Sequence, residues 1–164
     1  MKAKPPEPSE ALRAQKHRAE HAHCFACGEP SAEQPGLALA FALSGDGAGV
    51  EAEWLAPVWA TSYEGLVHGG LLATVLDAAM VHALFAHGIS GRTAALHLRY
   101  RHPVVPAKPC QISAQLLETR GPLHRLQACI HQDGRLCASA EADFLAAPTH
   151  PTTPLPPPTR SGKV

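Results

Sequence analysis

The sequence predicts an α+β fold in which an antiparallel sheet curls around one long central helix. A proline-free stretch from residue 69 to about residue 87 repeats apolar residues at spacings of three and four, the period of an α-helix. Strand-like segments lie on both sides of it, and the hairpin signal Asp133-Gly134 separates the last two. The helix is apolar around most of its circumference, so it needs cover on nearly all sides. A sheet wrapped around the helix supplies that cover.

The predicted elements follow the order β-β-α-β-β-β-β. Before the helix, residues 37–43 form an apolar run, and residues 49–55 alternate apolar and acidic side chains as a half-buried strand does. Residues 56–67 show neither pattern and are expected to be irregular. After the helix, strands are expected over residues 92–102, 110–119, 123–132 and 135–145.

The chain divides into one folded domain and two flanking segments. Residues 1–22 are expected to form a partly helical N-terminal extension in which Ser9 caps a short surface helix. Residues 23–147 contain all the core elements, and a length of 164 residues suits one domain with a single core. Residues 148–164 are rich in proline and are expected to be a disordered tail.

Bulk composition narrows the class of partners. The chain is 45% hydrophobic and 17% charged with a formal net charge of zero, so nothing in it draws the protein to nucleic acid or to an anionic membrane. Asp77 and His82 interrupt the apolar stretch, which argues against a membrane span. Five cysteines without a disulfide framework and no secretory signal favour the reducing cytoplasm.

The segment HGGLLATVLDAAM, residues 68–80, carries the chemistry. It places one carboxylate, Asp77, in a helix of small and apolar residues, where a buried charge is costly unless something uses or neutralises it. Gly69 and Gly70 open the helix, and backbone N–H groups at a helix start can hold a developing negative oxygen. An acid and such a cradle are two parts of acyl-transfer chemistry. The alternative is that hydrogen bonds satisfy Asp77 and that it serves only specificity of packing.

Spacing along the helix predicts a site shared between two chains. His68 and Asp77 are nine residues apart, which places them ~13 Å apart along the axis and roughly half a turn around it. One chain therefore cannot easily aim both the helix start and Asp77 at one small carbonyl. A second, antiparallel copy of the helix brings them together, which predicts a two-fold homodimer with shared sites. Whether such dimers pair into tetramers stays open.

Three segments resemble the hotdog-fold acyl-CoA thioesterases, in particular the subgroup that includes the phenylacetate-pathway thioesterase. The resemblance covers about residues 23–147. CFACGEPSAEQPGLALAF resembles the segment that leads into the first strand, YEGLVHGGLLATVLDAAM the helix signature, and RTAALHLRYRHPV the strand that follows. It implies a hotdog fold and an enzyme that hydrolyses an acyl-CoA to a free carboxylic acid and CoA.

The resemblance also implies roles for particular residues. Asp77 matches the catalytic acid, acting either as nucleophile or as base for water. Gly69 matches the glycine whose N–H binds the thioester oxygen, and His68 the histidine that orients the site. Thr93 matches a Ser or Thr that positions the water or the carboxylate. Ser62 stands where some relatives carry an Asn, so an amide contact is not expected there.

The substrate is expected to contact the helix start and nearby cations. Gly70 belongs to the expected substrate contacts together with Ser62. Arg99 and Arg101, at the end of a predicted strand, suit the phosphates of coenzyme A, although ordinary solvated arginines are the alternative. No cofactor is expected, since coenzyme A is part of the substrate. Acyl-chain length cannot be predicted from the sequence.

A cluster of potential metal ligands lies at the start of the domain. His21, His23, Cys24 and Cys27 include a C-x-x-C pair with zinc spacing. No second C-x-x-C follows, so two half-buried thiols are the favoured interpretation, no metal is expected, and metal binding by the cluster stays open.

Two further functions compete with the thioesterase hypothesis. A non-catalytic acyl-CoA-binding or regulatory hotdog protein is the main alternative, since Ser62 leaves the polar set incomplete. A dehydratase or hydratase of the same class fits less well, because HGG followed by a spaced Asp does not match its helix start.

Overall fold

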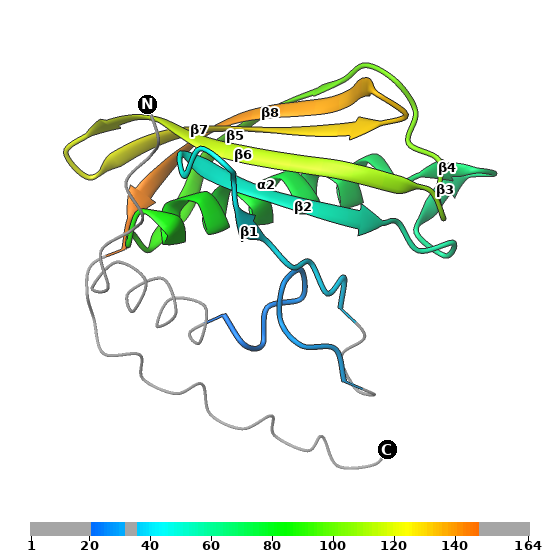
Figure 1. The fold of residues 1–164 in the computed structure, drawn as a ribbon, viewed down its shortest axis with the longest axis horizontal. Helices are drawn as coiled ribbons and strands as arrows, with labels where there is room; N and C mark the ends of the chain where they lie inside the picture. The colour runs from blue at the N-terminus through cyan, green and yellow to red at the C-terminus, as the bar shows by residue number, and fades with distance from the viewer. Residues whose placement is uncertain (1–20, 32–35, 148–164) are drawn as a thin grey trace, which may run out of the picture.

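The computed structural model describes residues 21–31 and 36–147. These residues form one long helix and a large antiparallel sheet, with a small two-stranded hairpin at one end (Figure 1). The helix is α2 (Gly69–Ala86). The strands are β1 (Ala42–Leu43), β2 (Gly49–Leu55), β3 (Thr61–Tyr63), β4 (Leu66–Val67), β5 (Gly91–Tyr100), β6 (Pro109–Arg120), β7 (Leu123–Gln132) and β8 (Arg135–Ala146).

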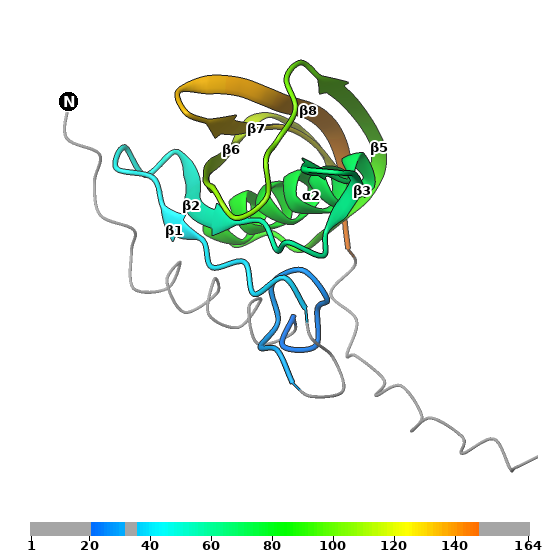
Figure 2. The same ribbon diagram turned by 90° about the vertical axis from the view of Figure 1, so that its right-hand side faces the viewer.

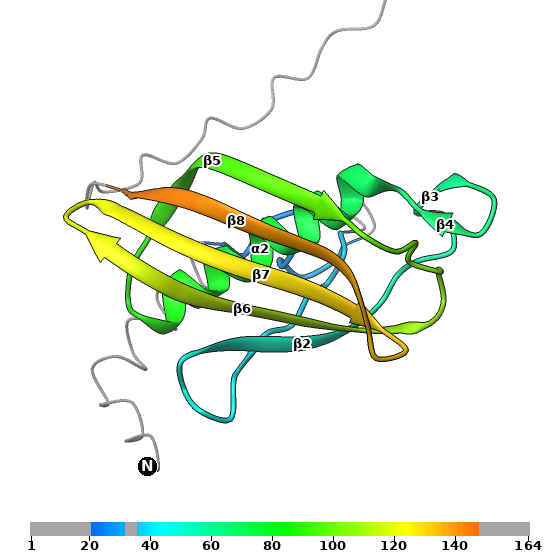
Figure 3. The ribbon, with the colours of Figure 1, turned by 90° about the horizontal axis from the view of Figure 1, so that it is seen from above.

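The large sheet has the strand order β1-β2-β6-β7-β8-β5, and each pair of neighbours is antiparallel. Seen from above, the long strands lie side by side across the helix (Figure 3). Seen from the end, the sheet bends around α2 so that the helix lies in its concave face (Figure 2). The predicted α+β fold, with a sheet wrapped around one central helix, is confirmed.

The helix is the centre of the core. Leu76, Met80 and Leu84 are fully buried at spacings of four residues, as a helix face that points into a core requires. They share one apolar cluster with Ile112 of β6 and Phe144 of β8. By length and composition α2 would also suit a membrane span, yet most of it is buried inside this fold, as is usual for a core helix.

Two predictions before the helix are wrong. Residues 37–43 are a strand only at Ala42–Leu43. Ala38 adopts a φ of 51°, and the amides of Leu37 and Leu39 donate to the carbonyls of Phe25 and Ala26, so this run pairs with the N-terminal segment rather than with the sheet. Residues 56–67, expected to be irregular, contain the β3–β4 hairpin, whose turn uses Gly65 at a φ of 72°.

The strands after the helix agree with prediction to within one or two residues. The strand over residues 123–132 has the predicted bounds, and the hairpin at Asp133-Gly134 is present, with both residues at positive φ. The strand expected over residues 92–102 ends at Tyr100. It ends early because the next two amides both donate to the carbonyl of Cys137, which stops the regular ladder.

The segment of residues 21–31 lies on the side of α2 that faces away from the sheet (Figures 1 and 2). The ring of His21 meets that of Phe85 edge-on at 5.0 Å, and Cys24 and Cys27 pack against the core cluster. This segment therefore forms a second wall next to the helix. The predicted helix after Ser9 and the tail at residues 148–164 lie outside the described residues, apart from the turn at residues 21–22.

Candidate active site

His68 caps the helix and organises its first turn. Its backbone is extended, with φ −62° and ψ 129°, and its Nδ1 accepts a hydrogen bond of 2.9 Å from the N–H of Gly70. Its carbonyl accepts from the N–H groups of Leu71 and Leu72 at 3.0 and 3.2 Å. Because Nδ1 accepts, the neutral ring carries its proton on Nε2, which is available as a donor. The N–H of His68 itself donates to the carbonyl of Ala60 at 2.8 Å. Three of the four amides that a helix start leaves without intrahelical partners, those of His68, Gly70 and Leu71, are therefore satisfied.

The remaining amide belongs to Gly69. Within the residues that the structure describes, its N–H has no hydrogen-bond acceptor. It stands at the first helical position, at the positive end of the α2 dipole. A single available donor in that field is suited to hold an oxygen that gains negative charge.

Asp77 lies on the strip of α2 that the sheet leaves uncovered. The strip also contains Gly70 and Thr74, which are not buried either. The Thr93 hydroxyl, on β5, donates a hydrogen bond of 2.6 Å to the Asp77 carboxylate. The prediction of a buried carboxylate is wrong for the single chain, since Asp77 is only half-buried. Thr74 and Val81, at −3 and +4 from Asp77, line the cavity between α2 and the N-terminal segment rather than the sheet side of the helix.

A second hydrogen bond sets the direction of β5 along the helix. The Tyr100 hydroxyl donates to the carbonyl of Gly69 at 2.8 Å. Since Thr93 meets Asp77 and Tyr100 meets Gly69, β5 runs antiparallel to α2. Sequence reasoning missed Tyr100. A signal was present, because Tyr100 shares the face of Leu96 and Leu98, the partly buried side of its strand.

The structure does not bring the helix start and Asp77 together within one chain. Gly69 and Asp77 are eight residues apart in one continuous helix, which is ~12 Å along the axis. Thr93 attaches to one position and Tyr100 to the other, at opposite ends of β5. The single chain therefore presents the Asp77 carboxylate and the Gly69 N–H at two separate places on α2.

Asp77 lines a cavity of about 150 Å³ between α2 and the N-terminal segment. Most of its wall is apolar, with Phe25, Ala78 and Val81 among the lining residues. His21, Cys24 and Cys27 complete the wall opposite the helix. An apolar cavity with one carboxylate at its edge suits a ligand with an apolar body and one reacting polar group.

The other predicted contacts are not among the residues that line the cavity of Asp77. Ser62 is exposed on β3. Arg99 is exposed on β5, and its cross-strand partner is Ser139. Because side chains alternate along a strand, Arg99 points to the face opposite to Tyr100 and the helix. Arg101 is exposed just past the end of β5.

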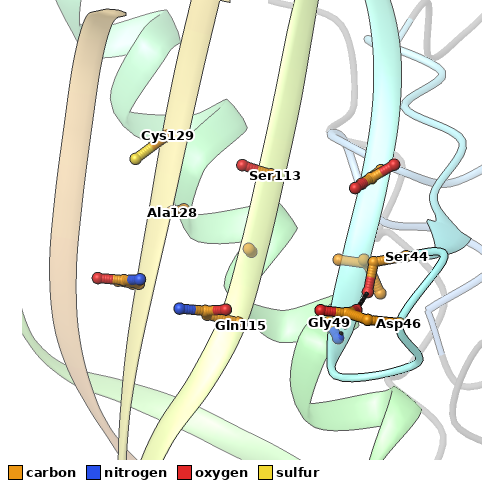
Figure 4. Close-up of a pocket in the computed structure, with 11 residues that line it drawn as sticks. Ser44, Asp46, Gly49, Ser113, Gln115, Ala128 and Cys129 are labelled. Atoms are coloured by element: carbon orange, nitrogen blue, oxygen red, sulfur yellow. Dashed lines mark hydrogen bonds between the residues drawn. The ribbon is translucent and has the colours of Figure 1, made fainter. Parts of the chain in front are cut away.

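A shallow depression of about 270 Å³ lies elsewhere, over β2, β6 and β7 (Figure 4). Its side chains include Ser113 and Gln115, which alternate with buried Ile112 and Ala114, so it lies on the outer face of the sheet. Its one aspartate, Asp46, is exposed and accepts from the Ser44 hydroxyl at 2.6 Å as part of a turn. That hydrogen bond lowers the pKa of Asp46, which marks a stabilised carboxylate rather than a catalytic acid.

The cysteines do not form a nucleophilic site. Burial, and next a hydrogen bond with Cys24, raise the pKa of the Cys27 thiol to about 12. Burial likewise raises the pKa of Cys110 to about 11. Both thiols stay protonated near neutral pH, and the protonated thiol is a poor nucleophile.

A single helix opened by His-Gly-Gly and enclosed by this antiparallel sheet defines a hotdog-fold protein. Residues 64–139, from the β3–β4 turn into β8, match the thioesterase superfamily. This match confirms the resemblance to that superfamily that the sequence indicated. No curated protein matches the chain in sequence.

Solved structures of thioesterase superfamily proteins share the fold. The E. coli PaaI protein from the phenylacetic acid degradation operon aligns with a TM-score of 0.68 at 14% identity, over 84% of this chain and 95% of that one. A putative thioesterase, a phenylacetic acid degradation-related protein of Ralstonia eutropha JMP134, aligns with a TM-score of 0.63 at 22% identity, over 81% and 98%. A hypothetical thioesterase with coenzyme A from Streptococcus pneumoniae TIGR4 aligns with a TM-score of 0.58 at 18% identity, over 60% and 81%.

Proposed function

We propose that the protein is an acyl-CoA thioesterase, which hydrolyses an acyl-CoA to a carboxylic acid and free CoA. The observation that carries the proposal is the Asp77 carboxylate, held by Thr93 at 2.6 Å beside an apolar cavity in a fold that also leaves the Gly69 N–H without an acceptor. The match of residues 64–139 to the thioesterase superfamily supports the reaction class. A similar structure holds coenzyme A, which supports the leaving group.

The chemistry needs no cofactor. A thiolate leaves readily, so one carboxylate and an oxyanion donor suffice. The Gly69 N–H holds the carbonyl oxygen while Asp77 either attacks the carbonyl carbon or takes a proton from the attacking water. Both routes consume one water and release a carboxylic acid and the CoA thiol. Thr93 keeps the carboxylate in one orientation in either route.

The Gly69 N–H and the Asp77 carboxylate can act on one thioester only when two chains associate. We infer a homodimer in which Gly69 of one subunit and Asp77 of the other face the same thioester. Within the described chain, β5 pairs with β8 alone, which leaves its outer edge open for a second copy. Large apolar side chains are exposed near the helix start: Val58 by 70%, Trp59 by 65% and Tyr63 by 77%. In this proposal Ser62 and Gly70 contact the substrate, and Arg99 and Arg101 contact the phosphates of CoA.

The direct test is thiol release from a panel of short, medium, long and aromatic acyl-CoAs. Turnover of at least one thioester, with free acid and CoA formed in equal amounts, is the expected result. Saturable binding of several CoA esters with no thiol released from any of them would instead establish the non-catalytic binding protein. Hydration of an enoyl-CoA without thiol release would point to the hydratase class.

Thr93→Val is expected to lower kcat by about tenfold and to leave KM nearly unchanged. Valine keeps the shape but removes the one hydroxyl that orients the Asp77 carboxylate, and a misplaced reacting group costs rate rather than binding. Thr93→Ser, which restores the hydroxyl, is the matched control and is expected to recover most of the turnover. Equal kcat in the Val and wild-type proteins would show that the hydrogen bond does not serve catalysis.

A further inference from the structure

Three ligand-type side chains meet in the N-terminal segment. In the part of the chain that the structure describes, His21, Cys24 and Cys27 form the one group whose potential ligand atoms lie within 4.8 Å of one another. The Cys27 Sγ is 3.6 Å from the His21 Nδ1. His23, which the sequence placed in the same cluster, is exposed and lies outside the group.

The separations fit a tetrahedral transition metal. Zinc with Zn–N of ~2.0–2.1 Å and Zn–S of about 2.3 Å places adjacent N and S ligands roughly 3.6 Å apart and adjacent S ligands roughly 3.8 Å apart. The observed N–S distance has this value, and the three ligand atoms all lie within 4.8 Å of one another, at most about an ångström above the S–S separation. Side-chain rotation alone can close such a gap.

The backbone holds the two cysteines in a tight turn. The Cys24 N–H donates to the carbonyl of His21 at 2.9 Å, and the Gly28 N–H donates to the carbonyl of Cys24 at 2.8 Å. A Cβ at position 28 would lie 2.4 Å from the carbonyl oxygen of Ala22 and 2.6 Å from that of Cys24, so only glycine fits there. The turn that contains Cys24 and Cys27 is therefore closely packed and held by its own backbone hydrogen bonds.

We propose that the chain binds one divalent zinc ion through His21, Cys24 and Cys27, with water as the fourth ligand. Binding of the metal displaces the thiol protons of Cys24 and Cys27 to solvent. Two thiolates and one imidazole suit zinc better than they suit harder cations. All three residues line the cavity of Asp77, and His21 also contacts Phe85 of α2. The metal would thus fix the N-terminal segment against the helix and keep the wall of that cavity in place.

This role is structural and separate from hydrolysis. The cavity wall depends on the position of residues 21–28, whereas the proposed reaction uses Asp77 and Gly69. Metal binding is measured directly and does not require turnover, so failure of the thioesterase proposal leaves this inference standing. The converse also holds.

The test uses the full-length protein, reduced and stripped of metal with a chelator, then titrated with Co²⁺ and with Zn²⁺. We expect one Co²⁺ per chain, with thiolate-to-cobalt charge-transfer absorption and tetrahedral d–d bands, and displacement of Co²⁺ by one equivalent of Zn²⁺. Zinc addition is also expected to protect the amides of residues 21–28 from hydrogen exchange. The affinity for Co²⁺ and Zn²⁺ should fall in each of Cys24→Ser, Cys27→Ser and His21→Ala. Loss of a residue that only hydrogen-bonds to a metal ligand already costs ~10–100-fold in affinity, so loss of a ligand should cost at least that much.

Matched controls come from the same residue types. His23→Ala removes an exposed histidine two residues from a ligand, and Cys129→Ser removes a thiol of the sheet; both are expected to bind metal as the wild type does. Absence of thiolate-to-cobalt absorption in the wild-type protein would overturn the proposal, and so would its persistence in a Cys24→Ser/Cys27→Ser variant. Rapid formation of a Cys24–Cys27 disulfide that zinc does not prevent would identify a redox pair instead.

Discussion

Asp77→Asn is expected to reduce thioester hydrolysis by ~10²–10⁴-fold, the usual contribution of a positioned acid or base. Asparagine has the same shape. Its amide oxygen can still accept the hydrogen bond that the Thr93 hydroxyl donates to Asp77 at 2.6 Å in the wild type. The change therefore removes the charge and the basicity while it preserves the local structure. Turnover of the best acyl-CoA, measured by thiol release, gives kcat, and calorimetric titration with CoA gives binding.

The expected signature is a loss of kcat with little change in CoA affinity or thermal stability. Asp77→Ala adds the loss of the Thr93 contact and is expected to be no more active than the asparagine variant. Glu53→Gln, at an exposed position of β2, is a control that removes a carboxylate elsewhere and should leave turnover unchanged. Turnover by the Asp77→Asn protein at the wild-type rate would contradict the catalytic role proposed for Asp77.

Gly69→Pro is expected to reduce kcat by ~10²–10³-fold, the cost of losing one oxyanion donor. Proline removes the backbone N–H and is well tolerated at the first position of a helix, where Gly69 stands. His68 already has the extended conformation that the residue before a proline requires, with φ −62° and ψ 129°. The substitution therefore removes the N–H donor at position 69 and keeps the helix.

Gly69→Ala is the matched control, because it adds a Cβ but keeps the N–H. That Cβ would lie 3.4 Å from the nearest atom of the Tyr100 ring, an ordinary van der Waals contact. Turnover within a few-fold of wild type is expected. If the alanine and proline variants lost activity equally, the methyl group rather than the missing donor would be the cause. Circular dichroism of both proteins confirms that α2 remains.

The elements with strong periodicity could be predicted because local pattern and burial agree in them. Helix α2 and strands β6 to β8 carry that pattern, and their bounds shift by at most one or two residues. Residues 37–43 carry an apolar pattern too, yet Leu37 and Leu39 pair with Phe25 and Ala26. Nothing local specifies that partner, since it depends on where the N-terminal segment lies in three dimensions.

Part of the candidate site could also be predicted from the sequence. The motif and its helical spacing identified Asp77 and Gly69 as separated groups, and the resemblance indicated Thr93. Tyr100 and the capping bond from the Gly70 N–H to the His68 Nδ1 were missed, because each depends on how β5 and the helix start lie in space. The half-burial of Asp77 in the single chain also depends on what packs against its side of the helix. Helix periodicity alone cannot say whether the sheet, the N-terminal segment or a partner subunit covers that side.

The central claim is that each site joins Gly69 of one subunit to Asp77 of the other. Co-expression of an Asp77→Asn chain with a Gly69→Pro chain, each with its own tag, allows the mixed dimer to be purified and its thiol release compared with both parents. One of its two sites then contains an intact Gly69 and an intact Asp77, so we predict about half of the wild-type turnover per dimer. Turnover that stays at the level of the two parent variants would contradict a shared site.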